Sequence, residues 1–353
     1  MQLPPDRSLF ALINKSLIVK LGAIGDVATV LPAAWKLHQR GSRIDWLCGK
    51  AVAPLLSCYS WIHPIVVNEM RLMGGNRFTS ILEAMSTWRK LIGSSYDLCA
   101  MLQYDRRYQI LTIPVRARRS ISLRQDERAF KLVSERYHAA EFERILCNIP
   151  DAYRSDSIAP VAPDRLPPNP LPRCEKIRIA LAPGGARNLL RDDPQRRWPL
   201  ESYIALAKLL LDMGYEVVLT GGPDDAWVER QFASLPVDSH IGKWQIPQTL
   251  AFYQSCTCVV THDTGPLHLA GLTDCCLVGI FGPTAPSKCL PRRDGVVGLW
   301  GGENLACRPC YDGKSFAKCD WNGCMMAIDA QQVADAVQAL ISNPLTQWRV
   351  ENR

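Results

Sequence analysis

The sequence predicts an α/β protein with two parallel-sheet domains, and three observations lead to this prediction. The chain has 353 residues, too many for one ordinary domain, and 47% of them are hydrophobic, enough for two cores. Short apolar runs typical of buried strands alternate with helix-like segments, which indicates parallel sheets covered on both faces. A proline-rich stretch interrupts the alternation, which then begins again.

The first domain is expected at residues 1–150. Its expected elements are strands at 16–21, 43–48 and 97–102, a glycine turn at 22–25, and a helix from Asp26 towards Arg40. A linker is expected at 151–173, because proline is frequent from Pro150 to Pro172 and denies helices and sheets an amide donor. A long surface loop within one domain is the alternative.

The second domain is expected at residues 174–330. Its expected elements are strands at 177–182, 216–220, 258–261 and 276–281, and a helix that opens near Pro199, where proline is tolerated. Residues 331–353 are expected to form a C-terminal helix, and packing back on the first domain is one arrangement for it. Ligands of such sheets bind at the carboxyl ends of the strands, near helix N-termini.

The charge of the chain favours an anionic partner, although a merely solvated basic surface is the alternative. The net charge is +7, and Arg116, Arg118, Arg119 and Arg124 form a basic run, suited to a diphosphate or a phosphorylated membrane surface. Nucleic acid is not expected, because no binding motif is present. No apolar run approaches the ~20 residues of a membrane span, and the N-terminus lacks the pattern of a signal peptide, so a cytoplasmic protein is expected.

The first of three candidate motifs is KLGAIGDVATVLPA, from Lys20 to Ala33, with Asp26 at the start of a helix. A carboxylate there is stabilised by the helix dipole and by free amides, so a simple helix cap is the alternative to a chemical role. The glycine spacing is not the G-x-G-x-x-G fingerprint of dinucleotide-binding proteins, which argues against a dehydrogenase.

The other two motifs suit phosphate groups. APGGARNLLRDDPQRRWP, from Ala182 to Pro199, combines a glycine loop with clustered arginines, and a flexible loop with solvated arginines is the alternative. VVTHDTGPLHLAG, from Val259 to Gly271, places Asp-Thr-Gly at a strand-to-helix turn with His268 one turn along. That turn presents amides and a hydroxyl at a helix N-terminus, and a capped helix with a buried histidine is the alternative.

In this order and at these separations, the motifs and the later FGPTAP resemble the heptosyltransferase family, glycosyltransferase family 9, over roughly residues 16–330. The resemblance implies the GT-B architecture, in which two Rossmann-like domains face each other across a cleft. It implies ADP-heptose as the donor, inversion at the anomeric centre, and no catalytic metal or other catalytic cofactor. It also implies that Asp26 is the general base for the acceptor hydroxyl.

The resemblance assigns the donor to loops of the second domain. Arg196 stands where the family usually has a lysine, and either Asp224 or Asp225 would contact the nucleoside ribose. The implied donor-binding residues are Gly184, Gly185, Arg196, Asp224, Asp263, Thr264, Gly265 and His268.

Four of the fourteen cysteines form a separate cluster, Cys307, Cys310, Cys319 and Cys324. The C-x₂-C spacing followed by two more cysteines is typical of a four-thiolate site for zinc or iron, which would fasten a loop rather than catalyse. Four reduced thiols are the alternative. The other ten cysteines lie in apolar segments and are interpreted as small buried hydrophobic residues.

We therefore expect an inverting glycosyltransferase that moves heptose from ADP-heptose to the lipopolysaccharide inner core at the cytoplasmic face of the membrane. Its acceptor would be the anionic lipid A–core, with peripheral membrane contact left open. Three alternatives remain: a protein O-heptosyltransferase, a nucleotide-sugar epimerase of GT-B shape, and a non-catalytic nucleotide-sugar sensor.

Overall fold

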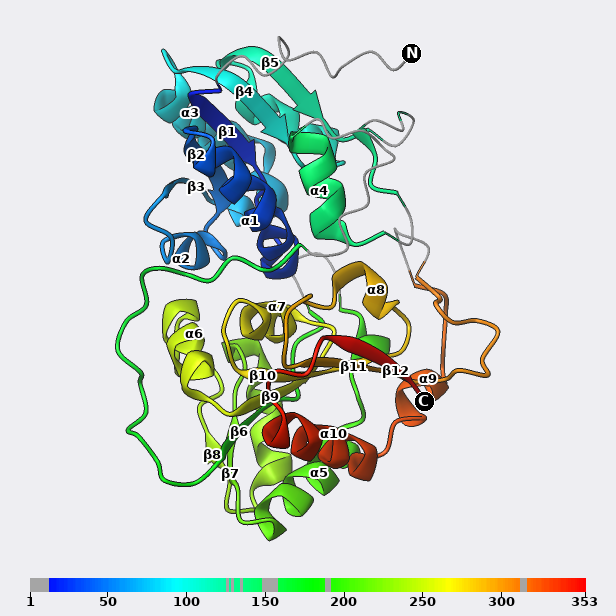
Figure 1. Ribbon diagram of the computed structural model, residues 1–353. Helices are drawn as coiled ribbons and strands as arrows, with labels where there is room; N and C mark the ends of the chain where they lie inside the picture. Colours follow the sequence, from blue (N-terminus) through cyan, green and yellow to red (C-terminus); the bar gives the residue numbers. More distant parts are fainter. Residues whose placement is uncertain are drawn as a thin grey trace, which may run out of the picture. The chain divides into compact units, whose positions relative to one another are not determined.

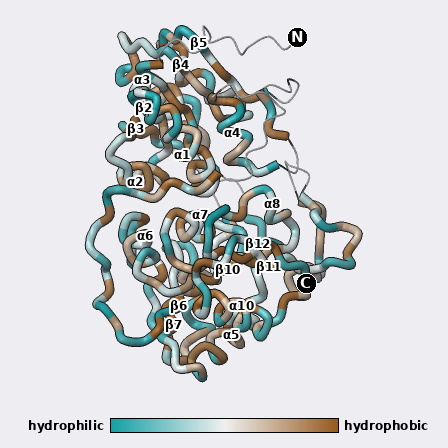
Figure 2. The backbone as a smooth tube through the Cα atoms, viewed as in Figure 1, coloured by the Kyte–Doolittle hydropathy of each residue, from teal (hydrophilic) through white to brown (hydrophobic). Residues whose placement is uncertain are grey.

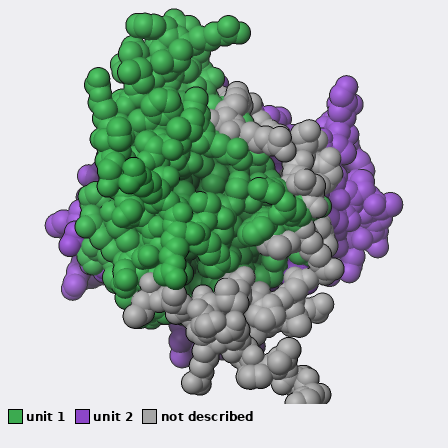
Figure 3. All heavy atoms as spheres, turned by 90° about the horizontal axis from the view of Figure 1, so that it is seen from above, with its two compact units in different colours: residues 1–22, 30–133, 139–154 green, residues 23–29, 134–138, 155–353 purple. Residues whose placement is uncertain are grey.

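The computed structural model describes residues 13–124, 127, 130–133, 136–147, 158–187, 192–311 and 316–353. The chain divides into two compact units (Figure 3). Unit 1 comprises Met1–Gly22, Val30–Val133 and Ala139–Arg154, and unit 2 comprises Ala23–Thr29, Ser134–His138 and Ser155–Arg353. Most of each unit is therefore contiguous in sequence, but the segment that carries Asp26 has its contacts with unit 2.

The first sheet has five parallel strands in the order β3-β2-β1-β4-β5. Its strands are β1 (Lys15–Val19), β2 (Arg43–Gly49), β3 (Ile62–Val67), β4 (Ser95–Met101) and β5 (Arg116–Ser122). The helices around it are α1 (Ile24–Gln39), α2 (Ala53–Leu56), η2 (Met70–Gly74), α3 (Arg77–Leu91), η3 (Arg106–Thr112) and α4 (His138–Leu146). The chain turns from β1 towards β2 and later returns from β3 to β4, so right-handed crossovers place α1 and α3 on opposite faces (Figure 1).

The second sheet has seven parallel strands in the order β12-β11-β10-β9-β6-β7-β8. Its strands are β6 (Arg178–Ala182), β7 (Glu216–Leu219), β8 (Asp238–Ser239), β9 (Cys258–His262), β10 (Cys276–Phe281), β11 (Val296–Trp300) and β12 (Arg349–Asn352). The helices are η5 (Pro194–Arg196), α5 (Leu200–Asp212), η6 (Pro223–Phe232), α6 (Ile246–Ser255), α7 (Gly265–Gly271), α8 (Pro286–Cys289), α9 (Gly323–Met326) and α10 (Ala330–Ser342).

The core of unit 2 explains why these segments form strands. β9 and β10 are buried along their whole length and are among the hydrophobic parts of the chain in Figure 2, as expected of strands covered on both faces. Alternate residues of β6, β7, β9, β10 and β11 face α5 and α10, while α6 and α7 lie on the other face (Figure 1). The predicted α/β class with parallel sheets is confirmed.

The C-terminal segment differs from the expectation. The helix α10 ends at Ser342, and the chain then adds β12 to the edge of the second sheet beside β11. The apolar face of α10 is buried in the core of unit 2 through Val333, Val337 and Leu340. Within unit 2 this helix contacts α5 and β10, and its packing back on the first domain stays a prediction.

None of the helices in the described ranges combines the length and the apolar content that crossing a membrane requires. Between residues 158 and 177, where the prolines cluster, the chain runs without a helix or strand.

Candidate functional site

The candidate residues of unit 2 gather at the carboxyl ends of β6 and β9. These two strands are neighbours, and the strand order reverses between them, because β7 and β8 lie on one side and β10 to β12 on the other. Ligands of open α/β sheets bind at such a switch point. The Gly184–Gly185 loop follows β6, and Asp263 and Thr264 follow β9.

The Gly184–Gly185 loop has no room for larger residues. A Cβ atom at Gly184 would lie 2.3 Å from Cγ of Asp225, and Gly185 has φ of +85°, a conformation that favours glycine. The Gly185 amide donates to Oδ1 of Asp225 at 2.7 Å, and Nε of Arg197 donates to the Gly185 carbonyl at 2.9 Å. The two glycines therefore let this loop pack closely against Asp225 and Thr264.

Asp225 connects the Gly184–Gly185 loop to the Gly221–Gly222 turn after β7. Besides the Gly185 amide, its carboxylate accepts a hydrogen bond from the Gly222 amide at 2.8 Å, at the start of η6. The neighbouring Asp224 is exposed. The structure therefore gives Asp225 a structural role and leaves Asp224 as the accessible carboxylate of the pair.

Asp263 is buried and is held from several sides. Its Oδ2 accepts a hydrogen bond from Oγ1 of Thr284 at 2.6 Å and lies 3.1 Å from a guanidinium nitrogen of Arg196. The Cys289 thiol donates to Oδ1 at 3.5 Å. Burial alone would raise the pKa of the Asp263 carboxyl, but Arg196 and Thr284 outweigh burial and hold it below its ordinary value. Asp263 is therefore a carboxylate that organises its surroundings.

Arg196 is a cation with an unused donor. Burial would lower the pKa of its guanidinium, but Asp263 raises it above the ordinary value, so the group stays charged. Its terminal nitrogen also donates to the backbone carbonyl of Asp263. Its Nε is buried and has no hydrogen-bond partner among the described residues. A buried donor without a partner costs about 1–3 kcal/mol, which an anionic ligand would remove.

His262 was missed in the sequence, although it stands directly before Asp263. It is fully buried at the end of β9, and its Nδ1 lies 3.0 Å from the Tyr203 hydroxyl. Burial, with Arg196 as a further cause, lowers the pKa of this imidazole to about 3. The ring is therefore neutral at physiological pH, and its buried Nε2 has no partner in the described part of the chain.

The segment with Asp26 lies beside His268 within unit 2. A Cβ atom at Gly25 would lie 2.5 Å from the His268 ring, so only glycine fits there. Burial lowers the pKa of the His268 imidazole, and the carboxylates of Asp263 and Asp26 act in the opposite direction. Asp26 stands in the first turn of α1. The structure therefore brings Asp26 of the first motif together with Asp263 and His268 of the third.

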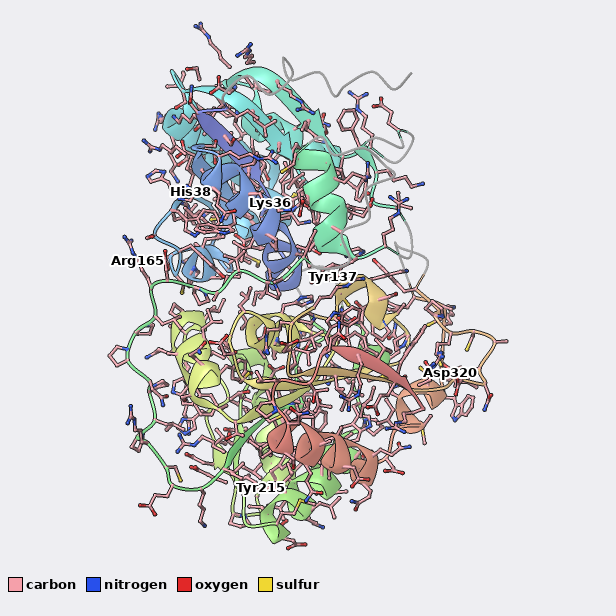
Figure 4. The ribbon with its side chains drawn as sticks, in the orientation of Figure 1. Lys36, His38, Tyr137, Arg165, Tyr215 and Asp320 are labelled. Atoms are coloured by element: carbon pink, nitrogen blue, oxygen red, sulfur yellow. The ribbon has the colours of Figure 1, made fainter. Side chains whose placement is uncertain are left out.

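The cysteine loop lies beside the FGPTAP segment that supplies Thr284. The amides of Cys310 and Tyr311 donate to the Pro283 carbonyl at 3.1 Å and 3.3 Å. Burial raises the pKa of the Cys310 and Cys324 thiols, and each is raised further by other cysteines of the cluster, so the thiols are near one another. Figure 4 labels Asp320, which is one of the described residues of this loop.

All four of these cysteines are free thiols. Within the described ranges, no three His, Cys, Asp or Glu side chains are arranged so that they could hold a metal ion. Four cysteine thiolates are chemically suitable ligands for zinc or iron. The metal site at these cysteines therefore stays a prediction.

Comparison with known proteins gives one family. A model of glycosyltransferase family 9 (heptosyltransferase) matches residues 84–319, more than half of the chain. The chain is 28% identical over 193 residues to lipooligosaccharide heptosyltransferase 2 of Haemophilus influenzae, covering 49% of the chain and 53% of that relative. It is 34% identical over 124 residues to lipopolysaccharide heptosyltransferase 2 of Escherichia coli K12, covering 33% and 34%. These matches span about half or less of the relatives' own length.

Solved structures share the fold. A family 9 glycosyltransferase of Veillonella parvula superposes with a TM-score of 0.70 at 20% identity, covering 93% of this chain and 97% of that one. The E. coli ADP-heptose lps heptosyltransferase II gives 0.64 at 20%, with 93% and 98% covered. The iron-containing dodecameric glycosyltransferase TibC of E. coli gives 0.59 at 14%, with 95% and 77% covered. These neighbours confirm the predicted α/β fold of GT-B type.

Proposed function

Because the chain belongs to glycosyltransferase family 9, the heptosyltransferase family, we propose that it transfers heptose from ADP-heptose to the lipopolysaccharide inner core. The names of a relative and of a structural neighbour, a lipooligosaccharide heptosyltransferase and an ADP-heptose lps heptosyltransferase, support this substrate pair. The observation that carries the proposal is the anion-ready site between β6 and β9, where the buried Nε of Arg196 lacks a partner.

The donor diphosphate would bind at this site. The Gly184–Gly185 backbone allows close approach, and the Arg196 guanidinium supplies a charge-assisted donor. Thr264 and Gly265 begin α7 beside the glycine loop, where a Cβ atom at Gly185 would lie 3.2 Å from Cβ of Thr264. Asp263 would hold Arg196 in position, His268 would lie near the reacting end of the donor, and the exposed Asp224 would reach the ribose.

Asp26 would act as the general base. The acceptor oxygen forms a new bond to the anomeric carbon while the bond from that carbon to the diphosphate oxygen breaks, with inversion. The acceptor proton passes to the Asp26 carboxylate, and ADP leaves with the electron pair. General bases of this kind contribute about 10²–10⁴-fold. The position of Asp26 in unit 2, beside Gly25 and the His268 ring, supports this role.

The domain roles are proposals as well. Residues 174–330 would bind the donor and residues 1–150 would bind the acceptor, an anionic lipid A–core that the arginines of β5 would attract. The reaction would take place at the cytoplasmic face of the membrane and would need no catalytic cofactor. The linker at 151–173 would connect the two domains, and the part of it before residue 158 lies outside the described residues.

A structural metal on the cysteine cluster belongs to the proposal too. Cys307, Cys310, Cys319 and Cys324 would hold zinc or iron, and the metal would fasten the loop that is bonded to Pro283. The iron content named for TibC, a neighbour in fold, supports this assignment. The metal would supply cross-linking of the loop and take no part in glycosyl transfer.

The experiment is incubation with ADP-heptose and a panel of truncated lipid A–core acceptors, read by mass spectrometry. We expect one acceptor to gain a single heptose, with release of ADP. Heptose gain by a protein instead would establish the O-heptosyltransferase alternative. Isomerised donor without acceptor would point to an epimerase, and bound but unchanged donor would point to a sensor.

A further inference from the structure

The helix α3 presents its apolar side outward. Phe78, Ile81, Leu82 and Met85 follow the i, i+3, i+4, i+7 spacing of one helix face, and their exposed fractions are 69%, 57%, 49% and 43%. The opposite face packs on the sheet with only Ala84, Thr87 and Leu91 buried. A surface helix ordinarily turns its apolar stripe to the core. The outward stripe therefore has no role in stabilising the sheet.

Neighbouring elements extend this apolar surface. The helix η3 contacts α3, and Nε1 of Trp88 donates to the Ile110 carbonyl at 2.7 Å. The chain adds exposed apolar side chains before, after and beside the helix. We call the whole set the α3 surface; it consists of Met70, Phe78, Ile81, Leu82, Met85, Ile92, Ile110 and Ile113. Exposed apolar side chains that gather on one helix face, with further ones on the elements that contact the helix, mark an interaction site.

The charges around the α3 surface select its partner. Arg71, Arg77 and Arg89 are exposed on or next to α3, and Arg89 lies on the same helix face as the apolar stripe by its spacing from Phe78. The acidic residues of this stretch, Glu69 and Glu83, are half-buried. Glu69 accepts hydrogen bonds from the amides of Lys50 and Ala51, and Glu83 accepts one from the Asn68 amide. An apolar face flanked by arginines is the pattern that binds anionic lipid surfaces.

We propose that the α3 surface docks unit 1 on an anionic lipid bilayer. The apolar stripe enters the interface between head groups and acyl chains, and the arginines bind the anionic head groups. A second copy of the chain is a poorer occupant, because a symmetric contact would bring arginine against arginine. The inference rests on the proposed function in one respect: an acceptor anchored in a membrane requires the protein to reach the bilayer surface.

The test is flotation of the full-length protein with vesicles that contain no acceptor and no donor. Vesicles of phosphatidylethanolamine and phosphatidylglycerol should bind the protein at low salt, and phosphatidylcholine vesicles should bind it weakly. Phe78→Ser with Leu82→Ser should reduce binding about tenfold or more, because the apolar contact is lost. Arg77→Gln with Arg89→Gln should remove most of the salt dependence of binding to the anionic vesicles. The matched control is Leu345→Ser, another exposed leucine, in unit 2, which should bind as the wild type does.

Three outcomes would overturn the proposal. The first is a wild-type protein that does not float with anionic vesicles, and the second is equal binding to both vesicle types. The third is unchanged vesicle binding in Phe78→Ser with Leu82→Ser while sedimentation velocity shows loss of a dimer, which would assign the surface to a second copy. A rise in melting temperature on addition of ADP shows that each variant is folded. The transfer activity of each variant on acceptor in detergent micelles should match that of the wild type. Vesicle binding without transferase activity in the wild-type protein would reject the proposed function and leave the docking surface standing.

Discussion

Asp263, which the sequence predicts as a donor-binding residue, is held in the structure by other side chains. Its carboxylate is buried and is bonded to Thr284 and Arg196, which lie far from it in sequence. The sequence indicated a polar turn at a strand end, but it could not show that FGPTAP supplies the partner. The neighbour His262 was missed because a histidine in an apolar strand has no pattern of its own. The backbone after β6 and β9, by contrast, was predictable from glycine and strand ends.

At this scale we predict that Arg196→Gln destabilises the protein and weakens donor binding. Asp263 would remain buried without its cation, and breaking a buried pair costs about 3–5 kcal/mol. Urea unfolding at pH 7.5 should show a loss of this size, and the rise in melting temperature caused by ADP should shrink. Arg230→Gln, an exposed arginine of the same unit, is the matched control and should change neither quantity.

The same pair sets a pH dependence. The pKa of Asp263 is lowered in the folded protein, so its ionisation adds stability that is complete above the unfolded value of about 3.9 and declines as pH falls towards the folded value. In Arg196→Gln, burial without the cation should raise the pKa of Asp263. Acid should then protonate the Asp263 carboxylate and remove the buried charge. The stability gap between wild type and variant should therefore narrow from pH 7.5 to pH 4.5. A gap that widens in acid would contradict the assigned pairing.

We predict that Asp26→Asn abolishes proton acceptance while keeping the fold. Asparagine has nearly the same size and keeps a hydrogen-bonding side chain in the first turn of α1. Turnover should fall by roughly 10²-fold or more, while the melting temperature and ADP binding should change little. The measurement is heptose transfer under saturating donor and acceptor.

Asp212→Asn, at the exposed end of α5, is the control for losing one carboxylate from unit 2. Near-normal turnover in Asp26→Asn would place the base elsewhere. An unfolded variant would show that the Asp26 carboxylate is needed mainly for the fold.

At the scale of elements, most buried strands were predicted, but the buried and apolar β11 was missed, as were β3, β5, β8 and β12. β1, β2, β4, β6, β7, β9 and β10 coincide with the predicted strands to within a few residues, because a strand covered on both faces is a continuous apolar run. The edge strands β5, with the sequence RARRSIS, and β12, with RVEN, have no such run. For α10 the amphipathic pattern predicts an apolar face but not the surface that covers it.

The cysteine loop gives a prediction at this scale. We expect about one zinc or iron per chain in protein purified without chelator, and loss of the metal in Cys307→Ser with Cys310→Ser. The loop is bonded to Pro283, next to Thr284, so its loosening should lower the melting temperature more than the affinity for ADP. Elemental analysis and thermal unfolding with and without ADP measure both effects.

Cys174→Ser removes an exposed thiol outside the loop and should keep the metal. Wild-type protein that is metal-free and fully active would reject the metal site.

At the scale of the whole molecule, the sequence predicted two sheets joined by a proline-rich segment. It could not predict that Ala23–Thr29 has its contacts with unit 2. Within that unit Gly25 lies against His268, and the two residues are separated by most of the chain. Patterns of apolar residues report which segments are strands or helices, but a contact of this kind depends on the packed structure. The segment that carries the proposed base therefore belongs to the same unit as the proposed donor site.

This grouping predicts which backbone amides donor binding will protect from hydrogen exchange. At a concentration of ADP about 100 times its Kd, amides of the site that exchange through opening should exchange about 100-fold more slowly. We expect this protection after β6 at Gly184 and Gly185, around Asp225, at the start of α7, and also in Ala23–Thr29. β2 and β3 of unit 1 should exchange as in the free protein. Hydrogen exchange read by mass spectrometry gives all of these segments in one measurement, and AMP, which lacks the β-phosphate, should protect the glycine loop less. Protection confined to unit 1, or spread evenly over both sheets, would contradict a donor site between β6 and β9.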